Sequence, residues 1–453
     1  MSESRQSIHG EWSGRLAFIL AATGSAVGLG NIWKFPYITG ENGGGAFVLV
    51  YLLCVAAIGI PIMVAEIMLG RRGRSTPVNT MTRLAAEAGG SSAWKWLGWM
   101  GMLAGFLILS FYSVIGGWAL AYVPALGSGA FAGQDAAFVG DQFASLLGSP
   151  LTLLAWHTLF MVLTMAVVAR GVRGGLEKAV YVLMPGLFVL MLILVGYAMS
   201  MGHFARAVEF LFTPDFSKIT GTGILIAMGH SFFTLSLGMG AIMIYGSYLP
   251  KRVSIARTTF IIAIADTTVA LLAGLAIFPI VFSNGLEPGA GPGLVFETLP
   301  LAFAHMPGGT IVGTLFFVLL VFAAWTSSIS LIEPAVTWLV EKRGMTRIKA
   351  CLFLGMSAWL LGVGTVLSFN EWSEIKLFGK TFFDSLDFLT TNILLPLGGL
   401  LIAIFAGWVL PRQICRDELE MKEQLGFRIW LFLIRYVTPV AIFCVFLNVV
   451  GLI

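Results

Sequence analysis

The feature that most constrains this chain is a series of apolar runs, each about 20 residues long, spread over its 453 residues. A helix of about that length crosses the hydrocarbon core of a bilayer. Charged residues make up only 11% of the chain, against about 25% in soluble domains. The sequence therefore predicts an all-α polytopic membrane protein. We expect no cleavable signal peptide, because residues 1–12 are polar and the apolar run after them is long enough to span.

The apolar runs predict eleven membrane-spanning helices and one shorter element. A stretch near 294–306 lies between charges and prolines and is too short to cross, so we expect it to form an extracellular helical cap. The predicted spans lie near residues 14–38, 44–70, 94–124, 151–169, 176–200, 220–248, 255–283, 309–341, 348–368, 382–409 and 429–451.

The positive charges predict the orientation. If the N-terminus is cytoplasmic, every predicted inside loop carries Lys or Arg, whereas the outside loops 123–151 and 284–308 carry none. Cytoplasmic loops are generally enriched in these residues. An odd number of spans then places the C-terminus outside. Of the 27 Lys and Arg residues, those on the outside are Lys34, Arg206, Lys218, Lys376 and Lys380.

Two of the predicted spans are interrupted. The first contains Gly24-Ser-Ala-Val-Gly-Leu-Gly-Asn31, and the sixth contains Thr234-Leu-Ser-Leu-Gly-Met-Gly240. Glycines weaken a helix where lipid offers no water to the freed backbone groups. One such patch could be a close helix crossing. Two patches that lie five spans apart are typical of transporters built from inverted repeats, with a binding site between broken helices.

Four segments carry a resemblance to the neurotransmitter:sodium symporter family, of which bacterial LeuT-like amino-acid transporters are the simplest members. The first consists of GSAVGLGNIWKFPY and, shortly after it, ENGGGAFVLVY. The other three are GIPIMVAEIMLGR, SFFTLSLGMGA and AAWTSSISL, and all four occur in the order in which the family has them. The resemblance implies a LeuT-like fold of two inverted five-helix repeats with broken helices 1 and 6, plus an eleventh helix. The expected divisions are 1–200 for the tail and first repeat, 201–410 for the second repeat, and 411–453 for the connector and last helix.

The resemblance also implies two sodium sites and no organic cofactor. Carbonyl, amide and hydroxyl oxygens are suitable ligands for sodium at broken helices. The first site corresponds to Ala26, Asn31, Thr234 and Asp266, the last of which is often Asn in relatives. The second site corresponds to Gly24, Val27, Ala323, Thr326 and Ser327. Without the resemblance, the hydroxyls of the second site would be interpreted as bonding back to their own helix.

The implied substrate is an amino acid with an uncharged side chain. Its carboxylate would bind the N–H groups of Leu29 and Gly30, the hydroxyl of Tyr112, and the first sodium ion, which Ala26 and Thr234 ligate. Relatives that carry amines have Asp at the position of Gly28. The pocket for the side chain would be lined by Ile108, Phe233, Ser236, Met239 and Leu331. Because these residues carry no charge, we expect an amino acid with an aliphatic or aromatic side chain. The same apolar residues could also be explained as simple core packing.

The gates differ from the family pattern. An outer Arg–Asp pair corresponds here to Lys34 and Asp387, and Lys lacks the bidentate fork of Arg. On the inner side, Glu341 stands where Asp is usual, with Arg5 near its expected partner position but out of register. Trp12 and Tyr248 match the inner-gate aromatic residues.

We also make predictions for the other charged and histidine residues in the spans, and for one helix that contains Gly175 and Pro185. Relatives that do not need chloride have Glu where this chain has Ala270, and Asp266 could supply that charge instead, so chloride independence is predicted. Glu66 is expected to cap freed N–H groups, and Glu333 to be solvated when the inner side opens. For His157 and His230, packing between helices is the simpler interpretation, and a role as proton carriers is the alternative. Gly175 and Pro185 could let one helix unwind and admit water, or could mark a static kink.

We therefore expect a sodium-coupled importer of hydrophobic L-amino acids in a bacterial cytoplasmic membrane. Its partners would be the amino acid and the lipid bilayer, with no nucleic acid, and it would be a monomer or weak homo-oligomer. An amino-acid sensor or a symporter for a related solute remains an alternative. An enzyme is not expected, because no HExxH, GxSxG or paired carboxylates occur within the spans.

Overall fold

The computed structural model describes residues 9–286, 293–421 and 424–449, which form a bundle of helices. In the described residues, nine helices are long and apolar enough to cross a membrane, and one bent pair makes a possible tenth. All of these coincide with predicted spans. The spanning helices are α3 (Gly45–Cys54) continuing into α4 (Ile60–Gly73), α6 (Lys95–Gly127), α8 (Pro150–Ala169), α9 (Glu177–Met199), α13 (Ile255–Ser283), α15 (Gly309–Arg343), α16 (Arg347–Leu367), α18 (Leu395–Ile404), and α20 (Gln424–Phe432) continuing into α21 (Thr438–Val449).

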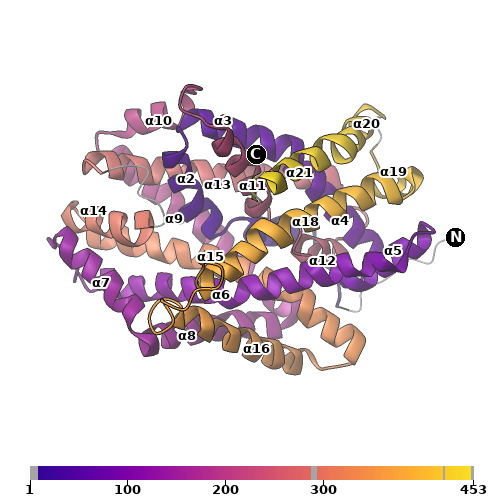
Figure 1. Cartoon of the computed structure of the whole chain (residues 1–453), viewed down its shortest axis with the longest axis horizontal. Coiled ribbons are helices and arrows are strands. Elements are labelled where there is room, and N and C mark those ends of the chain that lie inside the picture. Colours follow the sequence, from indigo (N-terminus) through magenta and orange to yellow (C-terminus); the bar gives the residue numbers. More distant parts are fainter. Residues whose placement is uncertain (1–8, 287–292, 422–423, 450–453) are drawn as a thin grey trace.

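The helices run mainly along the long axis of the molecule, and short helices lie at its two ends. In Figure 1, α7, α10 and α14 gather at one end and α5 and α19 at the other. The short helix α14 and the π-helical segment before it (Leu294–Thr298) occupy the region predicted to form a helical cap. The bounds of the short helices are α2 Phe35–Glu41, α5 Pro77–Glu87, α7 Ala136–Gly148, α10 Phe204–Phe212, α14 Leu299–His305, α17 Phe382–Asp387 and α19 Arg412–Leu419.

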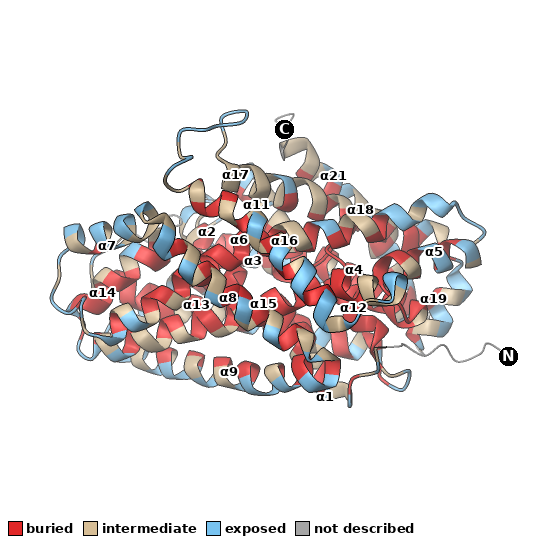
Figure 2. Cartoon of the chain, turned by 90° about the horizontal axis from the view of Figure 1, so that it is seen from below, coloured by how far each residue is buried: buried red, intermediate tan, exposed pale blue. Residues whose placement is uncertain are grey.

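Helices α6 and α15 form the centre of the molecule. They pack along each other, and 78% of the most apolar stretch of each is buried, against 28% for the last span, Leu425–Asn448. Figure 2 shows the same contrast, with buried residues on the central helices and exposed residues along α9. Lipid would cover these outer apolar faces, because a spanning helix satisfies its own backbone groups and needs only an apolar surround.

Both predicted helix breaks are present. Helix α1 (Arg15–Ala26) ends at the first glycine-rich run, and the chain resumes as a helix at Gly30 with a bend of 51°. The sixth predicted span is two helices, α11 (Gly221–Thr234) and α12 (Ala241–Ser247). Between them, Ser236, Gly238 and Gly240 all have positive φ, of 54°, 81° and 75°. The chain is therefore non-helical at both places, and the two breaks face each other, because the Ser236 hydroxyl donates to the Ser25 carbonyl over 2.7 Å.

Candidate functional site

A small cavity of about 30 Å³ lies between the two breaks and the central helices α6 and α15. Its volume is enough for one or two water molecules. Of the predicted substrate residues, all but Thr234 line it, and Ser25 and Ser327 line it as well. The predicted residues in its wall are Ala26, Gly28, Leu29, Gly30, Ile108, Tyr112, Phe233, Ser236, Met239 and Leu331.

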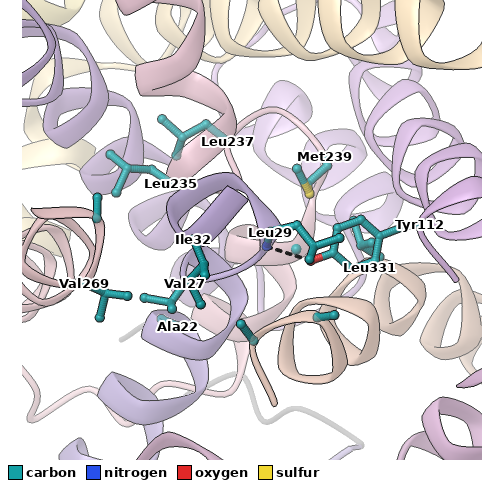
Figure 3. Packing of buried hydrophobic residues seen from close by; sticks show 14 of the residues in the cluster. Ala22, Val27, Leu29, Ile32, Tyr112, Leu235, Leu237, Met239, Val269 and Leu331 are labelled. Carbon is teal, nitrogen blue, oxygen red and sulfur yellow. Dashed lines mark hydrogen bonds between the residues drawn. The ribbon is translucent and has the colours of Figure 1, made fainter. Parts of the chain in front are cut away.

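The cavity has one polar side and one apolar side. On the polar side, the Leu29 N–H donates to the Tyr112 hydroxyl over 3.3 Å. Figure 3 shows this bond, with Met239 and Leu331 close to Tyr112. None of the lining residues is Lys, Arg, Asp or Glu. The arrangement can therefore offer hydrogen bonds to a small polar group and apolar contacts to the remainder of a ligand.

The residues predicted for the first sodium site form one hydrogen-bonded cluster beside this cavity. The Asn31 amide donates to Asp266 Oδ1 over 2.8 Å and to Thr234 Oγ1 over 3.0 Å. The Thr234 hydroxyl in turn donates to Asp266 Oδ2 over 2.9 Å. All three side chains are buried, and Ala26 lies in the wall of the adjoining cavity. The cluster brings a carboxylate, an amide and a hydroxyl together at the end of the first break.

The residues predicted for the second sodium site meet where α15 passes the end of α1. The Ser327 hydroxyl lies 3.4 Å from the Gly24 carbonyl and 3.2 Å from the Val27 carbonyl. The Thr326 hydroxyl lies 3.1 Å from the Ala323 carbonyl. The two helices pack closely here, because a Cβ on Gly24 would lie 3.2 Å from that of Thr326. The Ser327 hydroxyl of α15 therefore lies close to carbonyl oxygens at the end of α1.

A larger cavity of about 260 Å³ adjoins the first on the side of α17. Lys34, Asp384 and Asp387 line it, and Tyr112 and Phe233 are shared with the smaller cavity. Lys34 Nζ lies 5.2 Å from the centre of the Phe233 ring, and Asp387 accepts a hydrogen bond from Thr391 over 2.9 Å. In the described part of the chain no ion pair joins Lys34 to Asp387, and the role of these two residues as an outer gate stays a prediction.

The opposite side of the site is closed by the N-terminal segment. The Trp12 backbone N–H donates to the Tyr248 carbonyl over 3.1 Å, and its indole N–H donates to the Tyr245 carbonyl over 3.1 Å. The Tyr248 hydroxyl donates to Glu333 over 2.9 Å, and Glu333 also pairs with Arg347. Glu333 is thus fully buried in a paired state in this conformation.

The predicted gate residue Glu341 lies at the same side. Its Oε2 accepts hydrogen bonds from Ser75 over 2.6 Å and Asn79 over 2.8 Å, and its Oε1 lies 3.2 Å from His9 Nε2. Arg5, the partner considered from the sequence, lies outside the described residues. We did not anticipate His9, although its place three residues before Trp12 was a signal that it could reach the gate.

Other buried polar residues have structural partners. Glu66 accepts a hydrogen bond from the Gly238 N–H over 2.6 Å, so it caps a freed N–H group at the second break. His157 contacts the Trp359 carbonyl at 3.2 Å, and His230 packs against Phe35 and Tyr51. Both histidines therefore lie among packed helices.

Three comparisons with known proteins agree with this description. A sequence model of the Sodium:neurotransmitter symporter family matches residues 9–128 and 143–452. The chain is 42% identical to the sodium-dependent transporter YhdH of Bacillus subtilis (strain 168), over 98% of each chain. It is 36% identical to a sodium-dependent transporter of Haemophilus influenzae, over 96% of this chain and 97% of that one.

Among solved structures, MhsT in complex with L-phenylalanine superposes with a TM-score of 0.89. The two chains are 43% identical, and the match covers 97% of this chain and 99% of MhsT. This likeness confirms the predicted fold class, in which an all-α membrane domain is built around broken helices.

Proposed function

The chain belongs to the sodium:neurotransmitter symporter family, and we propose that it imports hydrophobic L-amino acids with sodium and without chloride. Family membership makes it a sodium-dependent membrane symporter and not an enzyme. We place it in the bacterial cytoplasmic membrane with its N-terminus inside and its C-terminus outside. The substrate class, the two sodium sites, the chloride independence and this orientation belong to the proposal.

The observation that carries the substrate class is the two-sided cavity between the breaks. Backbone N–H groups at the start of a helix favour a carboxylate, because they have no partner in the helix and lie at its positive end. Leu29, Gly30 and the Tyr112 hydroxyl would hold that carboxylate, while Ile108, Met239 and Leu331 would receive the side chain. A charged side chain would be rejected, because no lining residue could pair with it.

The cavity has to enlarge to hold an amino acid. Met239 can change rotamer at low cost because its side chain is unbranched. Phe233 lines both the small cavity and the larger one near Lys34, so its rotation would join the two. The phenylalanine in the MhsT complex supports an aromatic amino acid as one substrate.

Sodium would bind at the two oxygen clusters that flank the cavity. At the first, the ion would take the place of the hydrogen bonds that now join Asn31, Thr234 and Asp266, and it would contact the substrate carboxylate. At the second, it would join α1 to α15 through Val27 and Ser327. Each ion would therefore stabilise the broken helix in the conformation that binds substrate, which couples the two binding events.

Alternating access would use the two closed sides in turn. Opening toward the outside would widen the cavity between Lys34 and Asp387. Opening toward the inside would separate Trp12 from Tyr248 and expose Glu333 to water. Asp266 would supply a fixed negative charge beside the first ion, and this charge supports transport without chloride.

Equilibrium binding to the purified protein tests the proposal. We expect labelled tryptophan and leucine to bind in sodium gluconate but not in potassium gluconate, and labelled lysine to bind in neither. Equal binding in the two salts, or binding of lysine, would overturn the assigned site.

A further inference from the structure

A groove of about 260 Å³ lies between α8 and α16, and it shares no lining residue with the two cavities of the transport site. The two helices pack against each other, and Figure 1 shows them next to each other. They run in opposite directions. The Trp359 indole N–H donates to the Thr158 hydroxyl over 2.9 Å at one end of the contact, and the Arg347 guanidinium donates to the Val168 carbonyl over 2.6 Å at the other.

The groove has a buried floor and an exposed apolar rim. Cys351 and Gly355 stand one turn apart on α16 and are both buried, so two small side chains make the groove deep. Val162 of α8 and Leu352 and Met356 of α16 line it as well and are exposed. From Cys351 to the level of Trp359 the groove is about 12 Å long, at the rise of an α-helix. Its shape therefore suits a narrow apolar chain.

The polar groups in the wall are already bonded to protein atoms. The Thr158 hydroxyl accepts from Trp359 and donates to the Leu154 carbonyl over 2.6 Å. The indole N–H of Trp359 is used in the same contact. The remaining lining side chains are aliphatic or contain sulfur, apart from that of Gly355, which is only hydrogen. A groove of this kind favours hydrocarbon over water, and in a bilayer the available hydrocarbon is a lipid acyl chain.

The end of the groove near Cys351 is basic. Arg347 lies one turn before Cys351, about 6 Å along the helix, and pairs with Glu333. Arg170 directly follows α8 at the same end, and Lys349 lies in the first turn of α16. Both side chains are exposed, and neither has an ion pair among the residues that the structure describes. Two cations are therefore left without a protein carboxylate.

The spacing on α16 connects these charges to the groove. Lys349 precedes Leu352 by three residues and Met356 by seven, so the three side chains lie on one face of the helix. The start of α16 also carries the positive end of the helix dipole, which favours a phosphate. An anion at this end would continue directly into the apolar rim.

We propose that this groove binds one anionic phospholipid of the cytoplasmic leaflet, with an acyl chain between α8 and α16 and its phosphate against Arg170 and Lys349. Basic pockets between spanning helices on the cytoplasmic side bind anionic head groups in other proteins. A neutral lipid would leave the two cations unpaired, and a free phosphate would leave the apolar groove unfilled. The choice of leaflet rests on the orientation given under the proposed function, whereas the site itself does not.

Fluorescence quenching in bilayers of phosphatidylcholine tests the proposal. A small fraction of the lipid would carry brominated acyl chains, which quench tryptophan on contact. Trp359 lines the groove, and its signal is the difference between a protein and the same protein with Trp359→Phe. We expect anionic brominated phosphatidylglycerol to quench Trp359 at a mole fraction about tenfold lower than brominated phosphatidylcholine. High salt should reduce this preference.

Two pairs of variants separate the head group from the chain. Arg170→Gln combined with Lys349→Gln should remove the preference for phosphatidylglycerol, whereas Arg252→Gln, an exposed position in the loop after α12, should keep it. Val162→Phe would fill the groove from its exposed rim and should weaken quenching by both lipids. Val189→Phe, at an exposed position of α9, is the matched control and should leave quenching unchanged. A cooperative thermal transition shows that each variant is folded.

The outcomes are distinct from those that test the proposed function. Equal quenching by the two lipids in the wild type would overturn the inference, as would a preference that survives the loss of both cations. Full quenching in Val162→Phe would show that the chain does not occupy the groove. None of these measurements uses sodium or an amino acid, so a failure of the proposed transport activity would leave them unchanged.

Discussion

Asp266 is the residue on which the proposed sodium coupling depends most. It is fully buried, and it accepts hydrogen bonds from both Asn31 and Thr234. A buried carboxylate is costly unless it is paired with donors or with a cation. A sodium ion in this cluster would therefore be favoured by a charge that an Asn could not supply.

We predict that Asp266→Asn weakens the dependence on sodium. Loss of a charged ligand costs about 1.5–3 kcal/mol, so the sodium concentration for half-maximal binding should rise about 10- to 100-fold. Chloride should then increase transport, since it can supply the missing negative charge. The measurement is sodium titration of tryptophan binding with and without chloride. Thr268→Ala, on the exposed side of the same helix, is the control. If Asp266→Asn shows the same sodium dependence of tryptophan binding as Thr268→Ala, the role assigned to Asp266 is refuted.

Tyr112 tests the proposed carboxylate contact. Tyr112→Phe removes the hydroxyl that the Leu29 N–H now contacts and leaves the ring in place. We expect tryptophan binding to weaken about 10- to 100-fold. Tyr122→Phe is a matched control, because Tyr122 lies on the same helix and its hydroxyl bonds to the Phe296 carbonyl over 2.8 Å, away from the site. Equal affinities for the two variants would show that the Tyr112 hydroxyl does not contact the substrate.

At the scale of elements, the two helix breaks place the site. The breaks are visible in the sequence because glycines cluster where an apolar span should be helical. The positive φ of Ser236, at 54°, was not predictable in the same way. A left-handed conformation at a residue other than glycine is set by tertiary contacts, here by the bond from Ser236 to Ser25. The sequence therefore located the breaks but not their internal geometry.

Gly238→Ala tests the need for the second break. Gly238 has a φ of 81°, which alanine adopts only with strain, and a new Cβ would lie 2.5 Å from the Leu395 carbonyl. We expect a lower melting temperature and lost substrate binding. Gly229→Ala, in the interior of α11 with no atom within 4 Å of the new Cβ, should raise stability by up to about 1 kcal/mol. Thermal unfolding of the two variants in detergent makes the comparison, and an unchanged Gly238→Ala protein would contradict the account.

Some elements were missed by sequence reasoning. Helix α5 lies in a segment expected to be a loop, although Pro77 at its first turn is a usual helix-starting signal. This helix is short and amphipathic, too short to span a membrane, so hydropathy alone could not find it. The predicted division into two repeats at about residue 200 likewise cannot be derived from hydropathy and remains a prediction.

At the scale of the whole molecule, the positive charges predict which end faces the cytoplasm. Lys251 lies near the end that carries α5 and α19, since the carbonyl of Lys251 bonds to Arg71 at the end of α4. Lys376 lies between α16 and α17 and is exposed. The proposed orientation therefore places these two lysines on opposite sides of the membrane.

We predict that Lys376→Cys is labelled by a membrane-impermeant thiol reagent in intact cells, and that Lys251→Cys is labelled only after permeabilisation. Both variants would be made in a background without the four native cysteines. The reverse pattern would show that the charge distribution was misinterpreted, and labelling of both in intact cells would show that the intervening spans were assigned wrongly.

The central claim, that this chain couples hydrophobic amino-acid uptake to sodium without chloride, is tested most directly by uptake into proteoliposomes. Labelled tryptophan and leucine would be supplied with an inward gradient of sodium chloride, sodium gluconate or potassium chloride. The account predicts accumulation of both amino acids in the two sodium salts and none in the potassium salt. Accumulation in sodium chloride alone would contradict the role given to Asp266, and accumulation that is equal in sodium and potassium would contradict sodium coupling itself.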